Sequence, residues 1–235
     1  MPQSLHLIPV SLGESPVTHW LPPEVQKIAG TLDYYIAENA KTARAFLKLI
    51  KTEKPIQEIT IHALSRTTDA GQIRQWLKQT DSTRDIGLVS EAGCPAVADP
   101  GALVVQTAHE MGVRVVPWTG PSSIILGLMA SGLNGQNFTF HGYAPVAPAE
   151  RAQQLRTWEI ISRKNRQTQI FIETPYRNNA MFDALLQSLN DPTRLCVARA
   201  LTTNNEWIQT LSISEWKKRP APTLQKQPTL FLFQA

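Results

Sequence analysis

The stretch Asp85–Ser123 reads DIGLVSEAGCPAVADPGALVVQTAHEMGVRVVPWTGPSS and indicates how the chain folds. It opens with the short apolar run 86–89, which is typical of a buried strand. A turn-rich loop, 90–97, comes next, followed by a helical pattern that ends at Gly112, where a helix C-cap is expected. The apolar run 113–116 then predicts another strand, which ends at a proline. The stretch therefore predicts a strand–loop–helix–strand crossover, the unit from which parallel sheets are built.

The loops that follow these two strands, 90–97 and 117–123, hold most of the glycine, proline and serine of the stretch. Ligands of open parallel sheets bind beyond the carboxyl ends of the strands. Small residues at 91–95 permit close approach of a backbone to a ligand, although a plain surface turn has the same composition. The Gly-Pro-Ser-Ser sequence at 120–123 favours the ligand interpretation. Neither loop has the lysine and paired glycines of a phosphate-binding loop, and no G-x-G-x-x-G occurs, which favours adenosine with a neutral or zwitterionic tail over a nucleoside triphosphate or NAD.

The rest of the chain extends this pattern in both directions. Strands are predicted at 5–10, 33–37 and 56–64, alternating with helices at 23–32, 40–50 and 69–77. After residue 123, helices are predicted at 124–130, 148–162 and 178–189, and strands at 137–143, 169–172, 195–198, 206–213 and 229–233. Alternating polarity in the last two strands indicates antiparallel partners. We therefore expect two α/β domains, 1–118 with a mostly parallel sheet and helices, and 119–235 with a mixed sheet.

Composition sets outer limits on function. Apolar residues make up 42% and charged residues 18%, as in ordinary globular proteins. No apolar run approaches the ~18–20 residues of a membrane span, and the N-terminus lacks the features of a signal peptide. The two cysteines lie far apart, so we expect neither a disulfide scaffold nor a metal site, and a cytoplasmic protein. A net charge of +4 permits a polyanionic partner such as RNA, whereas Lys217-Lys218-Arg219 is typical of a solvated turn.

Three motifs together resemble the tetrapyrrole methylase superfamily: SEAGCP at 90–95, DPG at 99–101 and VRVVPWTGPSS at 113–123. They are most similar to the branch of ribosomal RNA small-subunit methyltransferase I, which typically reads S-D-A-G-T-P, D-P-G and R-V-V-P-x-P-G-P-S/C. A weaker similarity extends from Leu5 to about Phe233. The resemblance implies a two-domain α/β methyltransferase that binds S-adenosylmethionine in the cleft between its domains.

Carried over by position, the cofactor contacts of the resembling family fall on both predicted domains. They are Pro9, Ala92, Gly93, Pro95, Ser122, Ser123, Ile172, Leu201, Thr229 and Leu230. The second-domain positions rest on FIETPYR at 171–177 and ARALT at 198–202, which resemble F-Y-E-S-P-H-R and A-R-E-L-T. The chain departs from the family at 9–14, where PVSLGE replaces P-T-P-I-G-N, and at 226–230, where KQPTL replaces K-G-E-M-V.

Two acidic residues are the catalytic candidates. Glu91 matches the acidic position of S-D-A-G and lies next to the expected cofactor loop, which makes it a candidate for orienting or deprotonating an acceptor hydroxyl. Glu38 opens the sequence ENAKTAR, which is similar to the E-D-T-R motif of the family. Its position at a strand's carboxyl end fits the substrate side of a site, and equally fits an acid favoured by a helix N-terminus.

The resemblance implies transfer of the sulfonium methyl group to a ribose 2′-hydroxyl of ribosomal RNA, with the small ribosomal subunit as partner. Two alternatives stay open at this point: a small-molecule methylase acting on a tetrapyrrole, whose usual Gly-Asp-Pro loop is not found here, and a non-catalytic cofactor- or RNA-binding relative. Members of the rRNA branch commonly carry a further C-terminal segment, and we expect a chain without it to differ in its action on RNA. The resemblance also implies a homodimer, for which apolar residues near Trp20, Leu21 and Phe46 are the candidate surface. The alternative is that these residues complete the core of the first domain.

Overall fold

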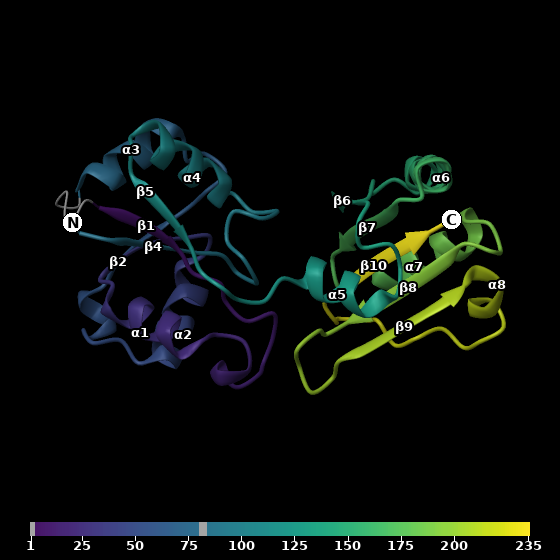
Figure 1. Cartoon of the computed structure of the whole chain (residues 1–235), viewed down its shortest axis with the longest axis horizontal. Coiled ribbons are helices and arrows are strands. Elements are labelled where there is room, and N and C mark those ends of the chain that lie inside the picture. Colours follow the sequence, from purple (N-terminus) through teal and green to yellow (C-terminus); the bar gives the residue numbers. More distant parts are fainter. Residues whose placement is uncertain (1–2, 80–83) are drawn as a thin grey trace. The chain divides into compact units, whose positions relative to one another are not determined.

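A computed structural model describes residues 3–79 and 84–235 and divides into two compact units, one ending at Ser122 and the other beginning at Ser123 (Figure 1). The predicted domain boundary between residues 118 and 119 stays a prediction. Among the described residues, no helix combines the length and the apolar character that a membrane crossing requires.

The first unit is a five-stranded parallel sheet with helices on both faces (Figure 1). Its elements are β1 (Ser4–Leu7), η1 (Val17–His19), α1 (Pro23–Thr31), β2 (Tyr34–Ala37), α2 (Ala40–Ile50), η2 (Ile56–Glu58), β3 (Thr60–Ala63), α3 (Ala70–Gln79), β4 (Ile86–Val89), α4 (Gly101–Glu110) and β5 (Arg114–Pro117). The strand order is β3-β2-β4-β1-β5, and every pair is parallel. The predicted parallel α/β architecture is therefore confirmed.

Side-chain alternation along the strands builds a separate core on each face of this sheet. Tyr35 and Ala37 of β2 belong to the cluster formed with α1 and α2, whereas Tyr34 and Ile36 belong to the cluster formed with α3 and α4. Successive side chains of a strand point to opposite faces, so a strand covered on both sides is apolar throughout. This explains why the central strands β2 and β4, YYIA and IGLV, are apolar throughout and fully buried.

The arrangement of β1 and β4 marks the edge of the sheet where a ligand is expected. These neighbours run parallel, with Leu5 opposite Ile86. The chain leaves β1 toward α1 on one face and leaves β4 toward α4 on the other, since α1 and α4 belong to opposite cores. Loops that diverge in this way leave a crevice at the carboxyl ends of the strands, the usual ligand position in doubly wound sheets.

The second unit has the predicted mixed sheet. Its elements are α5 (Ser123–Ser131), β6 (Phe138–Tyr143), α6 (Pro148–Asn165), β7 (Thr168–Glu173), α7 (Asn178–Ser188), β8 (Arg194–Arg199), β9 (Trp207–Ser212), α8 (Ile213–Trp216) and β10 (Thr229–Gln234). The order is β6-β7-β10-β8-β9, in which β6 and β7 are parallel and the other neighbours antiparallel. One face carries α5, where a Cβ on Gly127 would lie 2.3 Å from Leu230 Cδ2, so a larger residue there would displace the Leu230 side chain.

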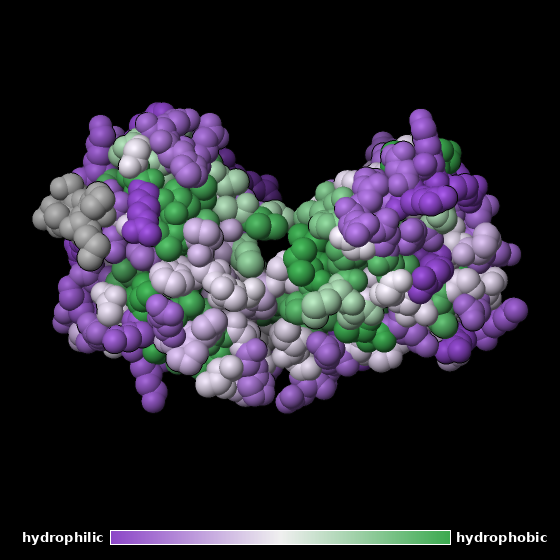
Figure 2. Space-filling view, in the orientation of Figure 1, coloured by the Kyte–Doolittle hydropathy of each residue, from purple (hydrophilic) through white to green (hydrophobic). Residues whose placement is uncertain are grey.

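The other face of that sheet packs against α6 and α7. Phe231 and Phe233 of β10 join Leu155 of α6 and Phe182 of α7 in one buried cluster. The outer surface of α6 is largely hydrophilic, as Figure 2 shows. The side of α6 that faces the sheet is mixed, because Leu155 and Trp158 are buried there together with Arg151, Glu159 and Ser162.

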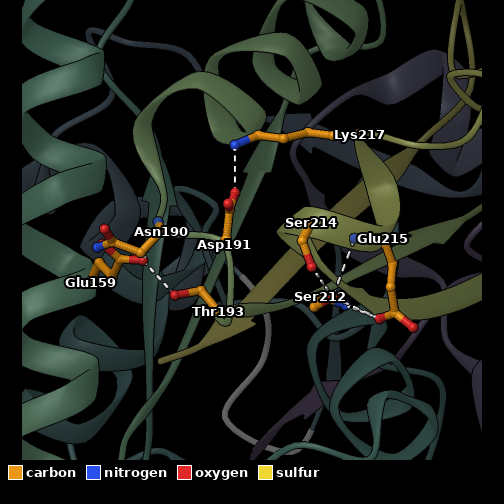
Figure 3. Close-up of polar contacts among 8 residues, drawn as sticks. All are labelled: Glu159, Asn190, Asp191, Thr193, Ser212, Ser214, Glu215 and Lys217. Carbon is orange, nitrogen blue, oxygen red and sulfur yellow. Dashed lines mark hydrogen bonds and ion pairs between the residues drawn. The ribbon is translucent and has the colours of Figure 1, made fainter.

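A buried carboxylate joins α6 to the loop between α7 and β8 (Figure 3). Glu159 is only 3% exposed, and its carboxylate accepts hydrogen bonds from the backbone N–H of Asn190 at 2.8 Å, from the side-chain amide of Asn190 and from the hydroxyl of Thr193. Three donors therefore satisfy a group that would be costly to bury alone.

We expect Glu159→Ala to lower the free energy of unfolding by at least about 2 kcal/mol, because it leaves these donors without their acceptor. Denaturant unfolding measures the change. Gln153→Ala, at an exposed position of the same helix, is the matched control and should change stability little. Equal stability of the two variants would show that water replaces the carboxylate at no cost.

Three details of the sequence prediction are wrong. The expected strand 5–10 ends at Leu7, and Val10 forms only an isolated bridge with Gly93. The expected strand 56–64 is shorter, because residues 56–58 form η2 after Pro55 and only Thr60–Ala63 pairs with β2. The expected apolar dimer surface does not form either: Trp20, Leu21 and Phe46 are 6%, 1% and 7% exposed. They are buried because they pack into the core that α1 and α2 share with the sheet.

Candidate functional site

Three loops meet at the carboxyl ends of the neighbouring strands β4, β1 and β5. Val10 N–H donates to Gly93 O at 3.0 Å and Gly93 N–H donates to Val10 O at 3.2 Å, which joins the first loop to the second. Cys94 Sγ donates to Pro121 O at 3.4 Å and joins the second loop to the third. A Cβ on Gly120 would lie 2.2 Å from Pro9 Cβ, so the third loop also packs directly on the first. The structure therefore brings the predicted residues Pro9 and Gly93 together.

Gly93 holds a position that disfavours any other residue. Its φ is +71°, and an added Cβ would lie 3.2 Å from Leu12 Cδ2 and 3.3 Å from Pro121 O. Positive φ is strained for residues that carry a Cβ, most of all for β-branched ones. Ala92 beside it is exposed and Pro95 is buried, so the loop presents its backbone near Ala92 while it is anchored at Pro95.

Ser122 and Ser123 are both half-buried and lie where the chain passes from the first unit to the second. Ser123 is the first residue of α5.

The other predicted cofactor residues gather at one edge of the second sheet. Strands β7 and β8 end where the antiparallel strand β10 begins, and Ile172 lies directly opposite Leu230. Leu201 is buried in the turn after β8. Thr229 differs: its hydroxyl accepts from Asn178 Nδ2 at 3.1 Å, so its side chain is held by α7 while the side chain of Leu230 lies against α5.

The turn after β8 contains a further polar group that the sequence analysis missed. Thr202 has φ +67°, and its hydroxyl is buried without a hydrogen-bond partner among the described residues. Buried polar groups are nearly always paired, so such an atom indicates an absent partner. The sequence signal was the ARALT motif, which drew attention to Leu201 alone.

Glu38, Asn39 and Glu91 form a hydrogen-bonded group at the ends of the paired strands β2 and β4. Glu38 Oε2 accepts from the backbone N–H of Glu91 at 2.9 Å, and Asn39 Nδ2 donates to Glu91 Oε1 at 2.9 Å. Asn39 also caps α2, since its Oδ1 accepts from Lys41 N–H at 2.9 Å. The two predicted catalytic residues are thus adjacent, and Asn39, which the sequence analysis gave no role, fixes the carboxylate of Glu91.

A half-buried acid supports the loop after β4. Asp99 Oδ1 accepts from Ala96 N–H at 3.0 Å and from Gly101 N–H at 2.6 Å, whereas its Oδ2 is buried without a partner among the residues described. Burial raises the pKa of Asp99. Ala96 and Ala98 have φ values of +67° and +62°, so the loop holds strained backbone around this carboxylate. The sequence signal for Asp99 was its place in the DPG motif.

A pocket of about 490 Å³ opens beside Glu91 within the first unit. Its lining comes from the loop after β1, from α2 and from the end of β4: Val10, Ser11, Gly13, Glu14, Ser15, Trp20, Thr42, Ala45, Phe46, Leu49, Ser90 and Glu91. The volume is typical of small-ligand sites, which are mostly apolar with a few placed polar groups. Glu91 therefore belongs to the loop that contains Gly93 and also lines this pocket.

Burial raises the pKa of Glu38 above its ordinary value of 4.5, and the negative charges of Asp99 and Glu91 raise this pKa further. The hydrogen bond from the backbone N–H of Glu91 lowers it in part. A carboxyl whose pKa is higher in the folded state destabilises the fold as pH rises from its unfolded pKa through its folded pKa. We therefore expect Glu38→Gln, whose side-chain oxygen still accepts from Glu91, to be more stable than the native chain at neutral pH. The difference should vanish below about pH 4.

Denaturant unfolding across the acid-to-neutral range measures this difference. Glu53→Gln, at an exposed position of the same unit, is the control. A native chain that is as stable as Glu38→Gln at every pH would contradict the prediction.

The fold and the loops at the strand ends are those of a known methyltransferase class. The family model described as Tetrapyrrole (Corrin/Porphyrin) Methylases matches residues 17–216. The chain therefore belongs to the tetrapyrrole methylase family and is a methyltransferase.

Its curated relatives include ribosomal RNA small subunit methyltransferase I of Xylella fastidiosa, 32% identical over 201 residues, which cover 86% of this chain and 69% of that one. The enzyme of the same name from Bacillus subtilis is 29% identical over 211 residues, covering 90% of this chain and 68% of the relative.

Solved structures support the fold. The methyltransferase CobJ matches with a TM-score of 0.62 at 15% identity, covering 99% of this chain and 93% of that chain. The cobalt precorrin-4 methyltransferase CbiF matches with a TM-score of 0.60 at 14% identity, covering 98% and 94%. At these identities the likeness concerns the fold alone.

Proposed function

We propose that the protein transfers the methyl group of S-adenosylmethionine to a ribose 2′-hydroxyl of small-subunit ribosomal RNA. The relatives named for small-subunit ribosomal RNA support the substrate. The observation that carries the proposal is the fixed carboxylate of Glu91, held by Asn39 Nδ2 at 2.9 Å and placed two residues before Gly93.

The residues present fit S-adenosylmethionine on two observations. Gly93 keeps open a space that a Cβ would fill, next to Leu12 and Pro121. The buried hydroxyl of Thr202 has no partner among the described residues and lies beside the proposed contact Leu201. In the first unit, Pro9, Ala92, Gly93 and Pro95 are proposed to hold the cofactor.

Ser122 and Ser123 are proposed contacts as well. In the second unit, Ile172, Leu201, Thr229 and Leu230 are proposed contacts on the family correspondence. Because the hydroxyl of Thr229 is engaged with Asn178, any contact there is expected to come from its backbone.

S-adenosylmethionine supplies, when bound, a sulfonium methyl group that is already activated for transfer. The residues of this chain then have to orient the acceptor oxygen and exclude water. Glu91 accepts a hydrogen bond from the acceptor hydroxyl and, in the stronger form of the proposal, takes its proton. Asn39 fixes one carboxylate oxygen of Glu91, and Glu38 holds its backbone, so the other oxygen is left for the acceptor.

The test is transfer of a labelled methyl group from S-adenosylmethionine to small-subunit RNA that lacks its ribose methyl groups. We expect the label in an alkali-resistant dinucleotide, because a 2′-O-methyl group removes the hydroxyl that alkaline cleavage needs. Label on alkali-released mononucleotides would place the methyl group on a base and overturn the ribose assignment. Transfer to a tetrapyrrole but to no RNA would support the small-molecule alternative.

The protein is further proposed to be a cytoplasmic homodimer. The location follows from a ribosomal substrate, and the dimer from the superfamily that the chain resembles. The contact surface has to differ from Trp20, Leu21 and Phe46, which are buried in the first unit. A monomer mass in light scattering over a wide concentration range would overturn the dimer.

A further inference from the structure

Helix α2 presents two different surfaces side by side. Lys41, Arg44 and Lys48 are exposed and, at spacings of three and four residues, share one face of the helix. Ala45 and Leu49 lie on the adjacent face and line the pocket beside Glu91. The cationic face and the pocket are therefore neighbouring features of one helix.

The charges of these two surfaces are opposite. Among the described residues, no carboxylate forms an ion pair with Lys41, Arg44 or Lys48. The lining that the described residues give the pocket holds two carboxylates, Glu14 and Glu91, and includes no lysine, arginine or histidine. A phosphate is therefore attracted to the helix face and repelled from the pocket, whereas a hydrogen-bond donor suits the pocket.

One polar atom in the pocket wall is left unpaired by the described residues. The hydroxyl of Ser15 is buried without a hydrogen-bond partner among the residues described, and Ser15 lines the pocket. Trp20 Nε1–H donates to the backbone oxygen of Ser15 at 3.4 Å, so an aromatic wall lies beside this hydroxyl. A solvated helix face would account for the cations, but it does not account for an unpaired buried hydroxyl in an aromatic-walled pocket.

We propose that α2 docks single-stranded RNA: its cationic face contacts phosphates, and the pocket takes one unstacked base that carries an exocyclic amino group. Proteins read single-stranded RNA by splaying bases against aromatic side chains and hydrogen-bonding their edges. Carboxylates accept hydrogen bonds from base amino groups, as Glu14 is placed to do at the pocket. This inference rests on the proposed RNA substrate and names the part of the chain that binds it.

The first experiment neutralises the cationic face. The triple variant Lys41→Gln, Arg44→Gln, Lys48→Gln is compared with Lys217→Gln, Lys218→Gln, Arg219→Gln, which removes three charges from an exposed turn of the second unit. Affinity for a single-stranded small-subunit RNA fragment is measured at several salt concentrations. Each lost phosphate contact lowers the slope of log K against log salt by about 0.7, so the α2 variant should lose about 2 and the control almost nothing.

The second experiment tests the pocket. The native chain should bind fragments that carry cytosine or adenine at the acceptor nucleotide about 5- to 150-fold more tightly than fragments with uracil. Ala45→Phe places a ring in the pocket from an exposed helix position and should abolish this preference. It should leave affinity for S-adenosylmethionine and the thermal unfolding temperature unchanged.

The outcomes separate this inference from the proposed function. A native chain that binds S-adenosylmethionine but neither binds nor methylates small-subunit RNA overturns the proposed substrate. A native chain that methylates this RNA, with unchanged RNA affinity in the α2 triple variant and in Ala45→Phe, overturns only the docking role of α2. In that result another partner, such as an acidic protein surface, would be the occupant of the cationic face.

Discussion

Glu91→Gln is expected to lower methyl transfer by about 10²- to 10⁴-fold while leaving the affinity for S-adenosylmethionine nearly intact. An amide still accepts the hydrogen bond from Asn39 Nδ2, which spans 2.9 Å in the native chain, but it is no useful base. Cofactor contact in this loop is expected from the backbone around Gly93, which the substitution leaves in place. Single-turnover methyl transfer and calorimetric binding measure the two quantities separately.

The size of the loss distinguishes two roles for Glu91. A loss within that range indicates proton transfer, whereas a carboxylate that only orients the acceptor hydroxyl should give a smaller one. Glu53→Gln, which removes an exposed acid of the same unit, serves as the control. Full activity in Glu91→Gln would remove Glu91 from the mechanism and leave Glu38 as the next candidate.

Asn39 and Glu91 depart from the family pattern in a mutually consistent way. The motifs E-D-T-R and S-D-A-G of the resembling branch carry aspartate at both positions, whereas this chain pairs an amide with the longer carboxylate. The Asn39 amide donates a hydrogen bond to Glu91. Two ionised acids at these positions would repel each other instead. The loss of the family's aspartate therefore does not argue for a non-catalytic relative.

Hydrophobic periodicity predicted most of the strands and helices of the first unit. The apolar runs and the helical patterns between them predicted parallel crossovers, and a parallel sheet brings the carboxyl ends of its strands to one edge. Periodicity thus predicts that the loops after these strands lie at one edge, whereas the choice of Pro9 and Gly93 within them came from the resemblance to the family. Strand order was harder, because β2 pairs with β4 and not with β1. The contact between Asn39 and Glu91, 52 residues apart, depends on that order.

Burial and side-chain direction set the other limits of the sequence prediction. Large apolar residues such as Trp20 and Phe46 occur both in contact surfaces and in cores, and the sequence alone does not distinguish the two. The packing of α1 and α2 shows that both residues belong to the core. Successive side chains of β10 point to opposite faces of the sheet, so Thr229 and Leu230 lie on different faces. The sequence does not show which of the two faces α5. The structure assigns Leu230 to that face through its contact with Gly127.

Gly93→Val is expected to weaken binding of S-adenosylmethionine and S-adenosylhomocysteine by about 5- to 150-fold, the equivalent of about 1–3 kcal/mol of backbone strain and displacement. Valine at φ +71° is strained, and its Cβ would press on Leu12 at 3.2 Å and on Pro121 O at 3.3 Å. Relief of that contact moves the loop that pairs with Val10, where the cofactor is proposed to lie. Calorimetry measures the affinity, and the native chain should bind neither NAD nor ATP appreciably.

Gly112→Val is the matched control, because Gly112 has nearly the same φ, +72°, but an added Cβ there meets no atom of the described residues within 4 Å. Strain alone should lower the stability of this control without changing its cofactor affinity, since Gly112 follows α4 at the opposite end from the loop. A folded Gly93→Val chain with native affinity would show that the backbone of this loop does not contact the cofactor. Equal losses of cofactor affinity in both variants would show that lower stability causes the weaker binding. A loss confined to Gly93→Val assigns the weaker binding to the space that glycine keeps open at the ends of β1 and β4.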